Sequence, residues 1–172
     1  MEVFVEPLVS TRRLVHTVRR RSGRLTAEEL IAAGCFAPVL ITAPFPFTVR
    51  AIARRVHAAS SRADAPLLHA SLPAFPLDAA RLQDLWAELL DRTVGGSLLL
   101  TELEETPAVV QKHLIGVLDE LANARRAGTP TVRIMGGTTA ILSDRVAVGA
   151  FSDRLFYRLN VIHIAVDDAA II

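Results

Sequence analysis

The 172-residue chain has only one cysteine, and aromatic residues make up only 5% of it. Its formal net charge is only +1, and it contains no long apolar run. The single Cys35 cannot form an internal disulfide, so we expect a reducing, cytoplasmic compartment. Without a run of roughly 18 apolar residues, a membrane-spanning helix is not expected. The N-terminus, with Glu2 and Glu6, lacks the basic start and apolar core of a signal peptide. The near-neutral charge argues neither for nor against a polyanionic partner.

Hydrophobic residues are nevertheless abundant, at 51% of the chain, and the mean hydropathy is +0.37. Two explanations stay open. Parallel strands that are apolar on both faces would account for this composition. An apolar surface covered by a partner or by a second subunit would account for it equally well.

Five short apolar runs alternate with helical patterns, which predicts one α/β domain with a parallel sheet covered by helices on both faces. No repeat, low-complexity segment or second domain is visible. The expected strands are residues 39–42, 67–70, 97–101, 132–135 and 161–166, and the expected helices lie at roughly 48–60, 78–92, 107–126 and 139–148.

The first 36 residues precede this pattern, and residues 37–172 form the predicted core. Residues 7–21 predict an amphipathic helix with apolar residues on one face and arginines on the other. Contact with nucleic acid or with an acidic partner is one interpretation of the arginines. A solvated helix face is the other, and we favour it because no aromatic residues are interleaved. Direct DNA binding is therefore not expected.

Residues 39–57 combine a strand pattern, a turn and a helix pattern. In this context a P-loop NTPase carries G-x-x-x-x-G-K-[ST], whose amides surround phosphate and whose lysine reaches the outer phosphates. The turn at 43–50 contains no glycine, two prolines that lack N–H donors, and two phenylalanines. The expected phosphate-binding loop is missing. We expect Phe45 and Phe47 to fill part of the nucleotide volume or to form part of a partner surface.

Five blocks of the sequence follow one another with a characteristic order and spacing. They are 41–57 (against I-T-G-E-S-G-T-G-K-E-L-V-A-R-A-I-H), 60–68 (S-x-R…P-F-V), 95–103 (G-G-T-L-F-L-D-E-I), 132–139 (V-R-I-I-A-A-T-N) and 151–161 (F-R-E-D-L-Y-Y-R-L-N-V). The chain therefore resembles the central AAA+ domain of bacterial sigma-54-dependent transcription activators. The resemblance implies a three-layer P-loop NTPase core with a five-stranded parallel sheet. It also implies that the helical lid is lacking, because the chain ends where the lid would begin.

The resemblance assigns degenerate Walker A positions to Ala43, Thr48, Val49 and Arg50. Val49 replaces the lysine and removes the principal positive charge that faces the outer phosphates. Arg50 either replaces some of that charge or is a surface arginine that opens a helix, and we favour the second interpretation.

The other parts of the implied nucleotide site are also altered. Thr101 stands for the Mg²⁺-binding aspartate, and a neutral hydroxyl favours a divalent ion only weakly. Glu102 remains at the water-activating position, without a metal or phosphate to act on. Thr139 replaces the sensor asparagine. Arg158 matches an arginine that faces a neighbouring subunit's nucleotide, or it pairs with Asp153 or another carboxylate.

These changes predict a pseudo-ATPase with no intact catalytic residue and no bound cofactor. No metal is expected either, because no ligand spacing joins Cys35 to the histidines at 16, 57, 69, 113 and 163. The segment 74–94 is too short for the G-A-F-T-G-A hairpin that contacts the sigma factor in this family. The favoured function is a non-enzymatic module of bacterial transcription control or signalling that binds an intact AAA+ activator or another signalling protein. A residual ATP/ADP-binding sensor and a decaying gene fragment are the alternatives.

Overall fold

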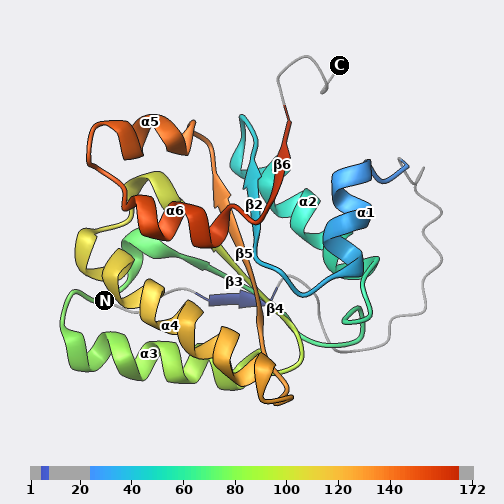
Figure 1. Cartoon of the computed structure of the whole chain (residues 1–172), viewed down its shortest axis with the longest axis horizontal. Coiled ribbons are helices and arrows are strands. Elements are labelled where there is room, and N and C mark those ends of the chain that lie inside the picture. The colour runs from blue at the N-terminus through green and yellow to red at the C-terminus, as the bar shows by residue number, and fades with distance from the viewer. Residues whose placement is uncertain (1–4, 8–23, 167–172) are drawn as a thin grey trace.

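A computed structural model describes residues 5–7 and 24–166 of the protein (Figure 1). The described part contains a six-stranded sheet with the order β1-β3-β4-β5-β2-β6. The strands from β2 to β6 are parallel, which confirms the predicted five-stranded parallel sheet, and β1 adds an antiparallel edge beside β3. The strands are β1 Val5–Pro7, β2 Val39–Thr42, β3 Leu67–Ser71, β4 Ser97–Thr101, β5 Arg133–Thr138 and β6 Ile162–Ala165.

Helices cover both faces of the sheet, so the three-layer architecture is confirmed (Figure 1). The first two helices pack on one face, and the remaining four helices contribute to the core on the other face. The helices are α1 Ala27–Gly34, α2 Pro46–Ala58, α3 Ala79–Arg92, α4 Ala108–Arg126, α5 Leu142–Ala147 and α6 Asp153–Leu159, with 3₁₀ turns at Leu72–Ala74 and Leu103–Glu105.

The strands β2, β3, β4 and β5 are apolar on both faces because each of them supplies two cores. In β2, Leu40 enters the larger core, whereas Val39 and Ile41 enter the core beneath α1 and α2. Successive side chains of a strand point to opposite faces, so a buried parallel strand needs an unbroken apolar run. The high hydrophobic content is therefore explained at least in part by this sheet.

Local signals explain where several helices begin. Asp78 caps α3, because its carboxylate accepts a hydrogen bond from the amide of Arg81 at 3.0 Å. The helix α4 begins at Ala108 after Pro107, and the hydroxyl of Thr106 donates to the Glu102 carbonyl and does not cap the helix. The predicted helix at 139–148 is shorter, spanning only Leu142–Ala147.

The helices α1 and α6 and the strand β1 were not predicted from the sequence. The helix α1 begins with a capping box in which Thr26 and Glu29 bond to each other's backbone amides. It packs against α2 and β6, and β1 joins the sheet, so parts of the first 36 residues belong to the folded core. Most of the predicted amphipathic helix at 7–21 lies outside the described residues, and residue 7 belongs to β1. No described helix is both long and apolar enough to cross a membrane.

Candidate functional site

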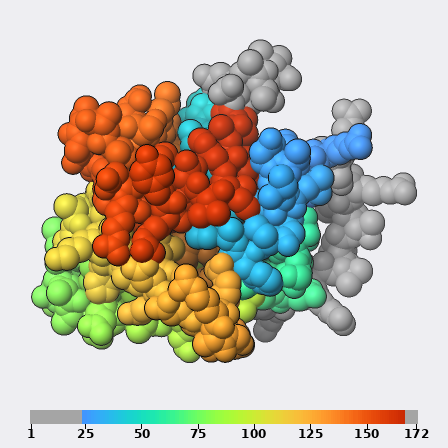
Figure 2. All heavy atoms as spheres, in the orientation of Figure 1, coloured from blue at the N-terminus to red at the C-terminus, as the bar shows by residue number. Residues whose placement is uncertain are grey.

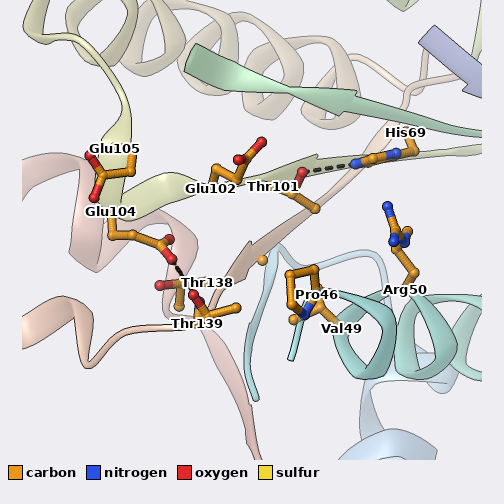
Figure 3. Close-up of a pocket in the computed structure, with 11 residues that line it drawn as sticks. Pro46, Val49, Arg50, His69, Thr101, Glu102, Glu104, Glu105, Thr138 and Thr139 are labelled. Carbon is orange, nitrogen blue, oxygen red and sulfur yellow. Dashed lines mark hydrogen bonds between the residues drawn. The ribbon is translucent and has the colours of Figure 1, made fainter. Parts of the chain in front are cut away.

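A cavity of about 380 Å³ lies at the carboxyl ends of the parallel strands, beside the start of α2 (Figure 3). Ligands of open α/β sheets bind at this edge. Among the residues assigned by resemblance, Val49, Arg50, Thr101, Glu102 and Thr139 meet here, whereas Ala43, Thr48 and Arg158 do not line the cavity. The lining residues are Pro46, Val49, Arg50, His69, Thr101, Glu102, Glu104, Glu105, Gly137, Thr138 and Thr139.

The turn before α2 uses its amides within the protein. The helix begins at Pro46, two residues earlier than predicted, and the Phe45 side chain provides no cap. The amides of Thr48 and Val49 both donate to the Phe45 carbonyl, at 3.0 and 3.2 Å. The amide of buried Ala43 donates to the Thr138 carbonyl at 3.2 Å. These donors are therefore already bonded and do not form a phosphate cradle.

Val49 is a core residue, with only 1% of its surface exposed. Its side chain packs against Gly137 of β5. A Cβ atom added at Gly137 would lie 2.5 Å from Val49 Cγ1 and 3.3 Å from Thr101 Cγ2. At the positions assigned to the lysine and to the metal-binding aspartate, two methyl groups thus converge on a glycine.

The Thr101 hydroxyl is joined to His69 Nε2 by a hydrogen bond of 2.8 Å. His69 lies on β3, and no motif or spacing in the sequence marks it as part of this site. In Figure 3, Arg50 extends from α2 toward the side of the cavity that holds His69. Thr101, which stands at the position of the family's metal-binding aspartate, is therefore hydrogen-bonded to the side chain of His69.

Glu102 lies directly after β4 with a φ angle of +60°, in the left-handed region. A residue other than glycine adopts this conformation only at an energetic cost. The Ser71 hydroxyl donates to its carboxylate, so the end of β3 helps to hold the side chain. Glu102 thus has a defined backbone geometry, although the residue before it, at the position that corresponds to the family's metal-binding aspartate, is a threonine.

Glu104 holds Thr139, the residue at the sensor position. The Thr139 amide and hydroxyl donate to Glu104 Oε1 at 3.0 and 2.6 Å. Glu104 Oε2 is buried and has no hydrogen-bond partner among the described residues. Burial, the largest influence, raises the pKa of Glu104, but the hydrogen bonds from Thr139 and from backbone amides outweigh it. The net pKa lies below the ordinary value for glutamate. Sequence reasoning missed Glu104, although the acidic run 102–105 after a strand was a visible signal.

The cavity carries an excess of negative charge. Among the residues that the structure describes, Glu102, Glu104 and Glu105 line it, together with one arginine, Arg50, and one histidine, His69. Glu105 forms a partly exposed ion pair with Arg145 at 3.3 Å, which offsets part of the charge. A site of this composition repels polyanions and does not concentrate them.

Phe45 and Phe47 do not fill the nucleotide volume, so this expectation was wrong. They are 44% and 61% exposed, neither lines the cavity, and their rings stack on each other with centroids 5.3 Å apart. The turn carries both rings to the outside of the molecule, where each ring covers part of the other. The alternative expectation, that they form part of a partner surface, stays a prediction.

Arg158 lies on α6, outside the cavity, and pairs with Asp119 of α4. Asp119 also pairs with Arg154 at 3.3 Å. Of the two interpretations of Arg158, pairing with a carboxylate describes its geometry in this chain, with Asp119 as the partner and not Asp153.

Comparison with known proteins places this geometry in a family. Over 145 residues the chain is 34% identical to the regulatory protein AtoC of Escherichia coli, covering 74% of this chain and 32% of AtoC. It is 31% identical over 130 residues to the DNA-binding transcriptional regulator NtrC of Escherichia coli, covering 66% of this chain and 28% of NtrC. The chain thus spans about a third of the length of these curated relatives.

Solved structures support the fold. The crystal structure of NtrX from Brucella abortus in complex with ATP matches with a TM-score of 0.67 and 25% identity, over 83% of this chain and 34% of that one. The P-loop NTPase domain of an Escherichia coli sigma-54 activator matches with a TM-score of 0.54 and 23% identity, over 80% of this chain and 87% of that one. The family model of the Sigma-54 interaction domain matches residues 79–165, a range that begins after the turn at 43–50. The chain therefore belongs to the Sigma-54 interaction domain family, with an AAA+-like P-loop NTPase fold.

Proposed function

We propose that this chain is a catalytically degenerate member of its family and acts as a non-enzymatic interaction module in bacterial transcription control. One observation carries the proposal. Where a nucleotide's phosphates and metal would lie, the methyl groups of Val49 and Thr101 meet at Gly137.

Phosphoryl transfer depends almost entirely on positioning and on stabilising negative charge with a lysine, amides and a metal ion. In this chain the amides of Thr48 and Val49 are bonded to the Phe45 carbonyl, and the lysine position is an aliphatic core residue. The three carboxylates that line the cavity add repulsion toward the phosphates of ATP. These features support a module that neither holds nor hydrolyses ATP.

A residual ATP/ADP sensor is the second candidate, because a cavity of about 380 Å³ remains and Arg50 lines it. Thermal unfolding with Mg·ATP and Mg·ADP separates the two candidates. A ligand of the native state at a hundredfold excess over its Kd would add about 2.7 kcal/mol of stability. We expect no shift in the melting temperature. A shift that Arg50→Gln removes would overturn the proposal in favour of the sensor.

The partner we propose is an intact AAA+ sigma-54 activator or a signalling protein of the same pathway, bound through the block 151–161. This block includes α6, which lies on the face shown in Figure 2 between α5 and α4. Its residues Tyr157 and Val161 are 73% and 56% exposed and line one surface cavity together with Arg158, so a partner that contacts Arg158 would also cover apolar surface.

Co-purification with the host's sigma-54 activators, followed by their ATPase rate, tests this partner. The proposal predicts association and a changed ATPase rate that Arg158→Ala restores toward the rate of the activator alone. Arg154→Ala is a matched control, because Arg154 lies on the same helix and pairs with the same Asp119. Absence of association, or equal effects of both variants, would contradict a specific role of Arg158.

A further inference from the structure

A second group of buried polar side chains lies at the opposite edge of the sheet, at the amino ends of β4 and β5. Arg133 is fully buried and Arg62 is 8% exposed. Arg133 donates to Ser97 Oγ at 3.2 Å, to the Ala32 carbonyl at 2.9 Å and to Ser60 Oγ at 3.4 Å. Neither guanidinium pairs with a carboxylate within residues 24–166. Buried cations without a counter-ion are costly, so this arrangement needs an explanation.

Arg62 has one bonded edge and one unbonded edge. Its Nη1 atom donates to the carbonyls of Gly96 at 2.9 Å and Thr131 at 2.8 Å, and the guanidinium lies 4.4 Å from the Phe36 ring centroid. Its Nε atom is buried without a partner, and Nη2 takes part in no hydrogen bond within the described residues. Nε and Nη2 together form the edge of a guanidinium that binds two oxygens of one oxyanion.

A cavity of about 430 Å³ adjoins Arg62. Arg125, at the end of α4, lines the same cavity, and so do the hydroxyl-bearing residues Ser61 and Thr129. No acidic side chain is among its lining residues in the described part of the chain. Burial first, and then the charge of Arg125, lowers the pKa of Arg62. The two arginines thus repel each other, and no carboxylate of the described residues lines the cavity between them.

We propose that this cavity binds a phosphate group, as inorganic phosphate or as a phosphate monoester, between the unbonded edge of Arg62 and Arg125. Two guanidinium charges favour a dianion over a single carboxylate, and hydroxyl groups at the rim supply further donors. The site lies at the amino edge of the sheet, whereas the degenerate nucleotide cavity lies at the carboxyl edge. It would give the module a ligand input that is independent of the lost ATP site.

The test is titration of the whole chain with inorganic phosphate, with acetate as the carboxylate arm and chloride at matched ionic strength as the reference. Nuclear magnetic resonance follows the Arg62 Nε–H signal and the backbone amides of Gly95 and Thr129. We expect saturable shifts at these three positions with phosphate and much weaker shifts with acetate. Signals of Val49 and Thr139, in the other cavity, should not move.

The variant Arg125→Gln tests whether phosphate binds in this cavity, because Arg125 is exposed and can be changed without disturbing the core. We expect phosphate to bind this variant about tenfold more weakly, the effect of losing one charge-assisted hydrogen bond. Arg126→Gln is the matched control, since Arg126 is the next residue of α4, bonds to Asn123 and does not line the cavity. Absence of saturable shifts in the wild-type chain, or equal weakening by both variants, would overturn the proposal.

Discussion

The contact between Val49 and Gly137 yields a sharp quantitative prediction. Gly137→Ala places a methyl group 2.5 Å from Val49 Cγ1 and 3.3 Å from Thr101 Cγ2. Overpacking of this kind in a close-packed core costs about 1–3 kcal/mol. We therefore expect Gly137→Ala to lower the free energy of unfolding by about that amount.

Val49→Ala alone should cost about 2 kcal/mol, because it removes two buried methyl groups. In the double variant, the alanine at 137 occupies space that Val49 has vacated. The two losses should therefore not add, and the double variant should be more stable than their sum by about 1–2 kcal/mol.

Wild type, the two single variants and the double variant form a double-mutant cycle. Urea denaturation of these four proteins measures the coupling free energy between positions 49 and 137, provided that the m-value stays constant. Gly116→Ala is a control in α4, where an added Cβ meets no atom within 4 Å. It should stabilise the protein by about 0.5–1 kcal/mol, since alanine is the better helix former. Additive losses in the Gly137–Val49 cycle would refute the packing of Val49 against Gly137, and with it the structural basis of the lost lysine position.

Three further predictions concern pH, the aromatic turn and α6. Burial, the largest influence, lowers the pKa of His57, so the unfolded chain binds a proton at this residue at higher pH than the folded chain does. The free energy of unfolding should therefore fall as the pH drops below the ordinary histidine value of 6.5. In urea melts at several pH values, His57→Gln should show a weaker dependence of stability on pH. Replacing Phe45 and Phe47 together with serine should change the unfolding free energy by less than about 1 kcal/mol, since neither ring belongs to the buried core. The same replacement should reduce association with a partner in co-purification. Arg158→Ala should lower stability by less than about 1 kcal/mol in urea melts, because its ion pair is partly exposed; a loss of several kcal/mol would show that the pair is structural.

The sheet could be predicted from the sequence because buried parallel strands give short, unbroken apolar runs. The strand at 39–42 was predicted with its observed bounds. The helix α1 was missed although its Thr26-x-x-Glu29 capping box is a readable signal. The edge strand β1 was missed for a physical reason: three residues carry too little periodicity to separate a strand from a helix start.

The candidate site was predicted in part, and only through the resemblance to a family. The resemblance assigned Val49, Thr101 and Thr139 to parts of one nucleotide site, and in the structure these three residues line one cavity. The contacts of His69 and Glu104 were missed because they join side chains from separate strands and turns, which no local pattern encodes. The outward position of Phe45 and Phe47 depends on the direction of the turn, which composition does not specify.

The proposed loss of nucleotide binding is tested most directly by signals from the cavity itself. The methyl resonances of Val49 and the amide resonances of Thr101 and Thr139 report on its wall, and Mg·ATP can be titrated to millimolar concentration while they are recorded. The cavity geometry predicts no saturable change in these resonances, whatever occurs at Arg62 on the opposite edge of the sheet. Saturable, Mg²⁺-dependent shifts at Val49, Thr101 and Thr139 would show that the cavity still holds a nucleotide, and the proposed degenerate function would be wrong.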